Sequence, residues 1–122
     1  MSSPSIPLSS SLTSSGIVLS VKVWIPVEKH EDFFHLMRPV YDAVVAEPEC
    51  RFFVITKNPQ EPEAISWFEG WSKDTDWLMN VQLQKEYYQP YLATTESWFV
   101  KPRWFEILSP VDGLVSFKVP EK

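Results

Sequence analysis

The sequence contains a single cysteine, Cys50, so no disulfide bond can form within the chain. This excludes the class of small secreted domains that disulfides hold together, and it fits a reducing compartment, so we expect a cytoplasmic protein. Only three glycines are present, and none belongs to a glycine-rich phosphate loop. The sequence therefore gives no support to a nucleotide, flavin or nicotinamide site, and we expect no cofactor.

Long apolar runs and an excess of positive charge are also absent. No stretch approaches the roughly 20 apolar residues that span a bilayer, so no membrane partner is expected. The formal net charge of −5 disfavours binding to phosphate backbones, so no nucleic-acid partner is expected either. The serine-rich start lacks the basic residues and apolar core of a secretory signal, and we expect residues 1–15 to be a disordered tail.

Aromatic side chains, by contrast, are abundant. Eight Phe, six Trp and four Tyr make up 15% of the 122 residues. A chain of this length fits one domain that can bury a core of its own. Such a core does not need six tryptophans, so we expect some of the rings to face a small flat ligand or a second subunit.

The hydrophobic pattern predicts an α+β fold over residues 16–122. Period-two alternation predicts strands, and one apolar face predicts a first helix that Pro39 should kink or split. The order is the ferredoxin-like β-α-β-β-α-β arrangement with one extra C-terminal strand. Two helices would cover one sheet face, and we expect a second copy of the chain to cover the other, giving a homodimer. The predicted strands are 16–26, 50–57, 64–71, 100–108 and 114–119, and the predicted helices are 27–47, 74–80 and 84–97.

Three short stretches carry a resemblance to a known family. They read AEPECRFFVI from Ala46, ISWFEGW from Ile65 and VQLQKEYYQPY from Val81. Together they resemble the antibiotic biosynthesis monooxygenase domains, which form dimeric α+β barrels. The resemblance implies a cofactor-independent monooxygenase of secondary metabolism. It would act on an aromatic or polyketide-type molecule, with molecular oxygen as co-substrate and the deprotonated substrate as electron donor.

The chain also departs from the family pattern. Gln82 stands where relatives often have histidine. Trp67 and Trp77 stand where some polyketide oxidases of the family have Asn and Tyr, whereas the strand tryptophan, Trp71, is retained. The axial histidine of a heme-degrading branch is missing, so heme binding is not expected.

These positions give the candidate site residues. We expect Gln82 or Arg103 to hold the substrate oxygen that becomes negative, and His35 is the candidate proton acceptor on the first helix. His35 could instead lie at the border of that helix with no role in the reaction. Glu69 could likewise point into the pocket, but we expect it to form an ion pair with Lys22 or to pack in the core. Five aromatic side chains are expected to line the pocket that binds the substrate, although each could also serve only to pack the core: Tyr41, Trp67, Trp71, Trp77 and Tyr88.

Two other functions remain open at the level of sequence, because one fold hosts many activities. The first is a non-oxidative cyclase, isomerase or lyase acting on a polyketide-type intermediate in the same pocket, which needs His35 or Glu69 to point inward. The second is a non-catalytic small-molecule-binding or stress-response module.

Overall fold

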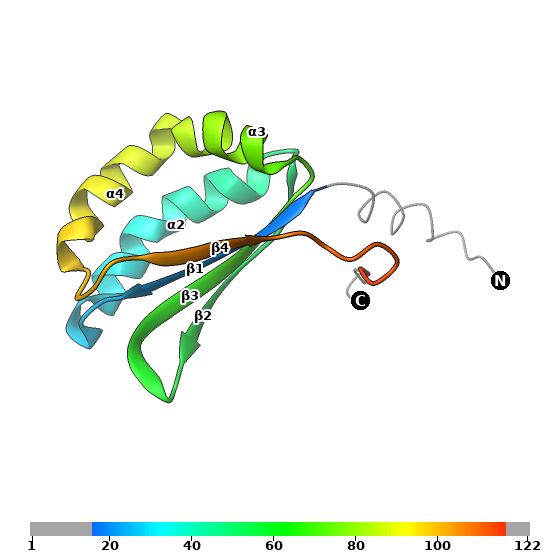
Figure 1. The fold of residues 1–122 in the computed structure, drawn as a ribbon. Helices are drawn as coiled ribbons and strands as arrows, with labels where there is room; N and C mark the ends of the chain where they lie inside the picture. The colour runs from blue at the N-terminus through cyan, green and yellow to red at the C-terminus, as the bar shows by residue number, and fades with distance from the viewer. Residues whose placement is uncertain (1–15, 117–122) are drawn as a thin grey trace, which may run out of the picture.

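A computed structural model describes residues 16–116 of the chain. Its four strands form one antiparallel sheet in the order β2-β3-β1-β4 (Figure 1). This is the predicted ferredoxin-like α+β arrangement, which is confirmed. The strands are β1 (Ile17–Trp24), β2 (Cys50–Asn58), β3 (Glu61–Trp71) and β4 (Trp104–Leu108).

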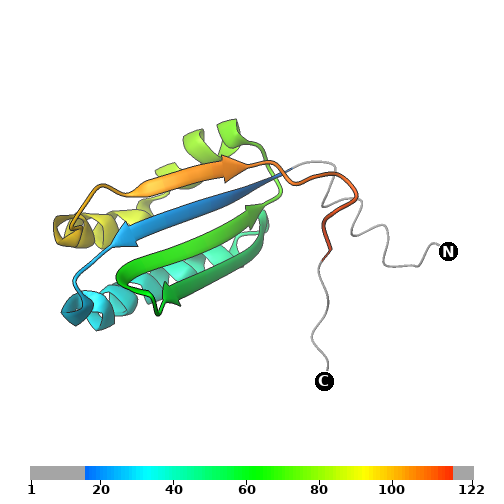
Figure 2. The same ribbon diagram turned by 60° about the horizontal axis from the view of Figure 1, so that its bottom comes forward.

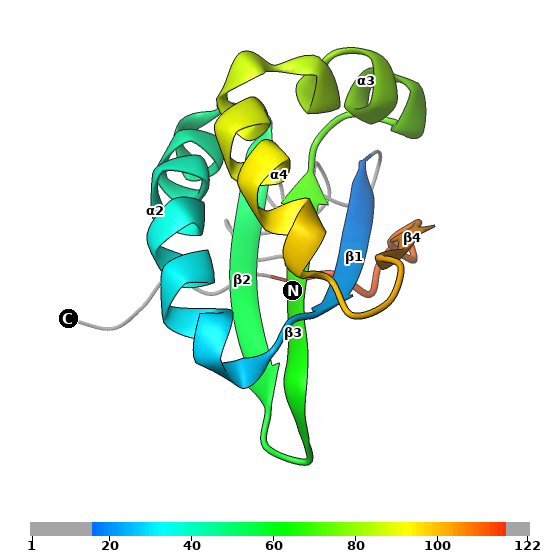
Figure 3. The same cartoon turned by 90° about the vertical axis from the view of Figure 1, so that its left-hand side faces the viewer.

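The helices all lie on one face of this sheet (Figures 1 and 3). The long helix α2 packs on β2 and also contacts α4, while short elements connect β3 to α4. The helical elements are η1 (Val27–Lys29), α2 (His30–Ala46), α3 (Thr75–Asn80), η2 (Gln82–Gln84), η3 (Glu86–Tyr88), α4 (Gln89–Thr95) and η4 (Glu96–Trp98).

Three predicted details differ in the structure. Pro39 was expected to kink or split its helix, and it does not split α2, which runs unbroken from His30 to Ala46 with the proline on its exposed side. The helix expected over 84–97 is a chain of 3₁₀ turns around the seven-residue α4. The fourth strand begins at Trp104 rather than at residue 100.

Two predictions fall partly or wholly outside the described residues. Residues 114–116 of the expected last strand have no strand structure, and residues 117–119 lie outside the described part of the chain. The tail expected over 1–15 lies outside it as well.

The core lies between the sheet and the helices. Odd-numbered residues of β1 and β3 face the helices, because side chains alternate along a strand and the two strands pair in register, with Leu19 opposite Glu69. Val23 and Ile65 on this face, and Phe33 from α2, are fully buried. This is the face from which the candidate site is built.

The opposite sheet face carries no helix among the described residues (Figure 2). The even-numbered side chains lie here, and several large apolar ones are exposed to between 39% and 48%. They are Val54, Phe68, Trp104 and Leu108. Gly70 also belongs to this face, and a Cβ atom there would lie 2.3 Å from the Phe52 ring, so the close approach of that ring requires glycine.

Candidate active site

Aromatic rings wall the interior between β3 and the helices. Trp67 and Trp71 are 6% and 0% exposed and point towards the helices from alternate positions of β3. Phe33 stacks on Trp67 with ring centroids 6.2 Å apart, and Trp77 of α3 packs on Trp71 at 5.6 Å. The structure thus places Trp67 and Trp71 on one face of β3 and brings Trp77 of α3 against Trp71.

Glu69 lies between Trp67 and Trp71 on the same face of β3. Its side chain is buried, and Trp71 Nε1 donates a hydrogen bond of 2.8 Å to its Oε1. Burial raises the pKa of the Glu69 carboxyl to about 7, against the smaller opposing effect of hydrogen bonds from Trp71 and Trp67. A buried carboxyl that titrates near neutral pH is suited to exchange a proton with a bound molecule.

The ion pair expected between Glu69 and Lys22 does not form. Lys22 is an even-numbered residue of β1 and therefore lies on the other face of the sheet, where its Nζ is 2.8 Å from Glu61 Oε1. The sequence contained the signal for a buried Glu69, because strict alternation places it on the face of Trp67 and Trp71. An unpaired carboxyl on that face has to be protonated, hydrogen-bonded or functional.

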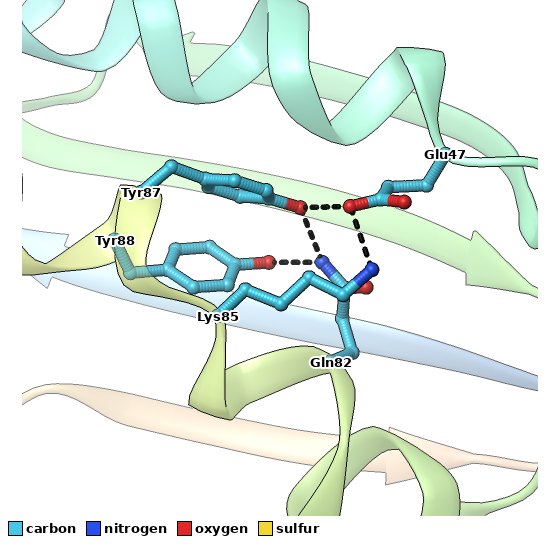
Figure 4. A network of polar contacts seen from close by, with 5 residues as sticks. All are labelled: Glu47, Gln82, Lys85, Tyr87 and Tyr88. Carbon is cyan, nitrogen blue, oxygen red and sulfur yellow. Dashed lines mark hydrogen bonds and ion pairs between the residues drawn. The ribbon is translucent and has the colours of Figure 1, made fainter.

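Gln82 supplies a second buried polar group. It is completely buried in η2, and its Nε2 donates to the hydroxyl oxygens of Tyr87 at 2.7 Å and Tyr88 at 2.8 Å (Figure 4). Its Oε1 atom has no hydrogen-bond partner in the described part of the chain. The amide is thus held by two tyrosines that follow it closely in the sequence.

This amide is tied to the end of α2 by a carboxylate. Glu47 Oε2 accepts hydrogen bonds of 2.8 Å from the Tyr87 hydroxyl and from Lys85 Nζ (Figure 4). The bond from Lys85, followed by that from Tyr87, holds the pKa of the Glu47 carboxyl below its usual value despite partial burial. Sequence reasoning missed Glu47 and Tyr87 as site residues, because they are 40 positions apart and no spacing rule connects them.

The tyrosines around the amide stay protonated at neutral pH. Burial raises the pKa of Tyr87 to about 12, and burial raises the pKa values of Tyr88 and Tyr91 further. The negative charge of Glu69 adds to the upward shift of the pKa at Tyr88 and Tyr91. These hydroxyls can therefore donate or accept hydrogen bonds but are not bases.

Two of the predicted catalytic residues lie outside this interior. His35 is exposed, because it falls between the buried Phe33 and Met37 on α2 and therefore points to the opposite side of the helix. Arg103 comes just before β4, its side chain is 40% exposed, and its Nη1 lies 3.8 Å from Glu96. Arg103 therefore lies just before the strand on which the sequence placed it.

Tyr41 lies in a separate groove between α2 and β2. This groove has a volume of about 510 Å³, and the Tyr41 ring packs on Phe53 at 5.1 Å. Phe53 pairs with Glu69 across β2 and β3, so the groove adjoins the interior at this position. The groove is lined by Phe34, Met37, Arg38, Tyr41, Phe53, Val54 and Ile55.

Within residues 16–116, no group of three or more His, Cys, Asp or Glu side chains is arranged so that it could hold a metal ion. In the same residues, no helix has the length and apolar character needed to cross a membrane.

Comparisons with known proteins bear on the family and the fold. No family model matches the sequence. A protein of Pestalotiopsis microspora named "Putative monooxygenase" is 33% identical over 98 residues, which cover 80% of this chain and 82% of the relative.

Solved structures share the fold at lower identity. A "Putative antibiotic biosynthesis monooxygenase" from Nitrosomonas europaea has a TM-score of 0.71 and 19% identity, over 80% of this chain and 92% of its own. One from Caulobacter crescentus has a TM-score of 0.71 and 17% identity, over 80% and 91%. A conserved protein of Methanosarcina mazei has a TM-score of 0.72 and 14% identity, over 81% and 96%.

Proposed function

Because the chain belongs to the antibiotic biosynthesis monooxygenase family, we propose that it is a cofactor-independent monooxygenase that oxidises a flat, electron-rich aromatic compound. The observation that carries the proposal is the aromatic interior formed by Trp67, Trp71 and Trp77, together with two buried polar side chains, Glu69 and Gln82. Flat rings stack on such walls, while the two polar groups orient the ligand.

The reaction needs no reductant other than the substrate. For an anthrone-type substrate, a CH₂ group becomes a carbonyl: two C–H bonds break, one oxygen atom of O₂ enters the product and the other leaves as water. The substrate gives up four electrons and O₂ takes up four. The first step is loss of a proton, which makes the ring system electron-rich enough to reduce oxygen.

Glu69 is the proposed acceptor of that proton. At neutral pH a carboxyl with a pKa of about 7 is present in both forms, so it can take the proton and return it to the reduced oxygen. The tryptophan walls exclude water, which preserves the reactive carbanion. Neither Arg103 nor His35 is needed for this scheme.

Substrate enters, in this proposal, beneath the cover formed by residues 75–88. Helix α3 has six residues and η2 and η3 have three each, so this cover contains few internal hydrogen bonds. Short elements of this kind open locally at lower free energy than a long packed helix such as α2.

The family name and the aromatic walls support a substrate of secondary metabolism, of polyketide type. The exposed apolar residues Val54, Phe68 and Leu108 on the helix-free sheet face support a homodimer, since such a patch is unfavourable in water.

Glu69 also favours a second function, a cofactor-free isomerase that moves a proton without consuming oxygen. An oxygen electrode separates the two. With purified protein, a metal chelator and anthrone, the oxygenase consumes one O₂ per anthrone oxidised, and Glu69→Gln lowers the rate by about 100-fold, as expected for loss of a general base. Absence of oxygen uptake with anthrones, hydroquinones and naphthols alike would reject the oxygenase.

A further inference from the structure

The partners of Gln82 determine which way its amide faces. The Tyr87 hydroxyl has one proton, and Glu47, as an ionised carboxylate that also binds Lys85, can only accept it. The Tyr87 oxygen must then accept from Gln82, and the group of Gln82 that donates is the NH₂ at Nε2. Tyr88 can donate or accept, so it does not fix the amide, whereas the Glu47–Tyr87 pair does.

This orientation leaves one buried acceptor atom without a hydrogen bond. Oε1 of the fully buried Gln82 has no partner among the described residues, although the opposite amide orientation would be available if Tyr87 were free to donate. A buried carbonyl oxygen without a donor is unfavourable and rare in folded proteins. Glu47 and Tyr87 thus hold the amide in the orientation that keeps an acceptor available.

We propose that Oε1 of Gln82 accepts a hydrogen bond from a hydroxyl group of the substrate, and that Glu47 is a positioning residue that fixes this acceptor through Tyr87. The inference rests on the proposed function, because it takes the same interior as the substrate-binding site. It goes further in assigning the substrate a free hydroxyl group. A methyl ether cannot donate, and a quinone carbonyl would face the oxygen of Gln82 with an oxygen of its own.

The predicted signature is selectivity for a donor. In equilibrium dialysis, the intact protein binds 2-naphthol about 10-fold more tightly than 2-methoxynaphthalene, the effect of one hydrogen bond to a buried acceptor. Tyr87→Phe and Glu47→Ala reduce the preference to about 2-fold or less, because the amide can then turn its NH₂ towards the ligand. Glu47→Gln retains the preference, because its amide oxygen can still accept the Tyr87 proton.

Glu61→Ala is the matched control. Glu61 accepts hydrogen bonds from a lysine and an aromatic side chain, Lys22 and Trp24, each 2.8 Å long, as Glu47 does from Lys85 and Tyr87. This variant removes an equivalent ion pair elsewhere and is expected to keep the 2-naphthol preference. Circular dichroism on each variant ensures that only folded protein is compared, and Tyr87→Phe carries the test if Glu47→Ala does not fold.

Each remaining outcome contradicts the inference. Equal affinity of the intact protein for both naphthalenes overturns it and leaves oxygen uptake, and hence the proposed function, untouched. Retained selectivity in Tyr87→Phe overturns the positioning role, as does loss of selectivity in Glu61→Ala. Absence of naphthalene binding together with oxygen uptake on anthrone also overturns the inference alone.

Discussion

Glu69 couples the ionisation of one residue to the stability of the whole protein. Its pKa is near 4.5 when unfolded and about 7 when folded, so between these values the folded state keeps a proton that the unfolded state has lost. Stability therefore falls as pH rises from about 4.5 to about 7 and levels off above. The expected loss is roughly 3 kcal/mol.

Glu69→Gln removes this loss, because glutamine does not titrate. Urea unfolding at pH 5 and pH 7.5 measures the loss of stability between these two pH values. Glu63→Gln, which changes an exposed glutamate of the same strand, is the control. If Glu69→Gln loses as much stability between these pH values as the parent protein, the carboxyl does not have the raised pKa.

Trp71 lowers the pKa of the Glu69 carboxyl through a hydrogen bond. Its indole N–H stabilises the charged form, so Trp71→Phe raises the pKa of Glu69. The pH midpoint of oxygen uptake moves up by about one unit, since a hydrogen bond to a charged group contributes about 1.5 kcal/mol. Trp98→Phe, in η4, should leave the midpoint in place. A midpoint unchanged in Trp71→Phe would mean that another group titrates.

At the residue scale, the alternation of side chains along a strand was enough to predict which residues of β3 share a face. Alternation along the strand predicted over 64–71 puts Trp67 and Trp71 on one face, which they share with Glu69 in the structure. The contacts of Gln82 were not predictable, because Glu47 meets Tyr87 only when the end of α2 and η3 come together in the folded chain. His35 is exposed at the border of the apolar stripe of α2, which is the alternative that the sequence left open for it.

At the scale of elements, the short helix α3 depends on its N-terminal cap. The Asp74 carboxylate accepts a hydrogen bond of 2.9 Å from the Trp77 backbone N–H. Asp74→Ala should lower the free energy of unfolding by about 1 kcal/mol and speed hydrogen exchange in residues 75–88. Asp76→Ala, in the first turn but not the cap, should have a smaller effect. Equal effects of the two substitutions would show that the cap does not stabilise the cover.

Strand alternation predicted β1, β2 and β3 well, because one face of each strand is buried and the other is more exposed. The region of 84–97 was predicted poorly. Its tyrosines follow helical spacing, yet the chain there takes 3₁₀ turns that carry Tyr87 and Tyr88 to Gln82. Tertiary hydrogen bonds thus override local helix preference in the segment that covers the site.

At the scale of the whole molecule, the helix-free sheet face should hold two chains together. Phe68→Glu places a charge among exposed apolar side chains of this face, and we expect it to convert a dimer into the 14.2 kDa monomer in sedimentation equilibrium. Val45→Glu, at an exposed position of α2, should leave the dimer intact. A dimer that survives Phe68→Glu would place the interface elsewhere.

The most direct test of the central claim is an experimental structure of the protein with 2-naphthol bound. The account predicts that the ring lies against Trp71 beneath residues 75–88, with its hydroxyl within hydrogen-bond distance of Gln82 Oε1. A ligand found instead in the groove between α2 and β2, against Tyr41 and Phe53, would contradict it.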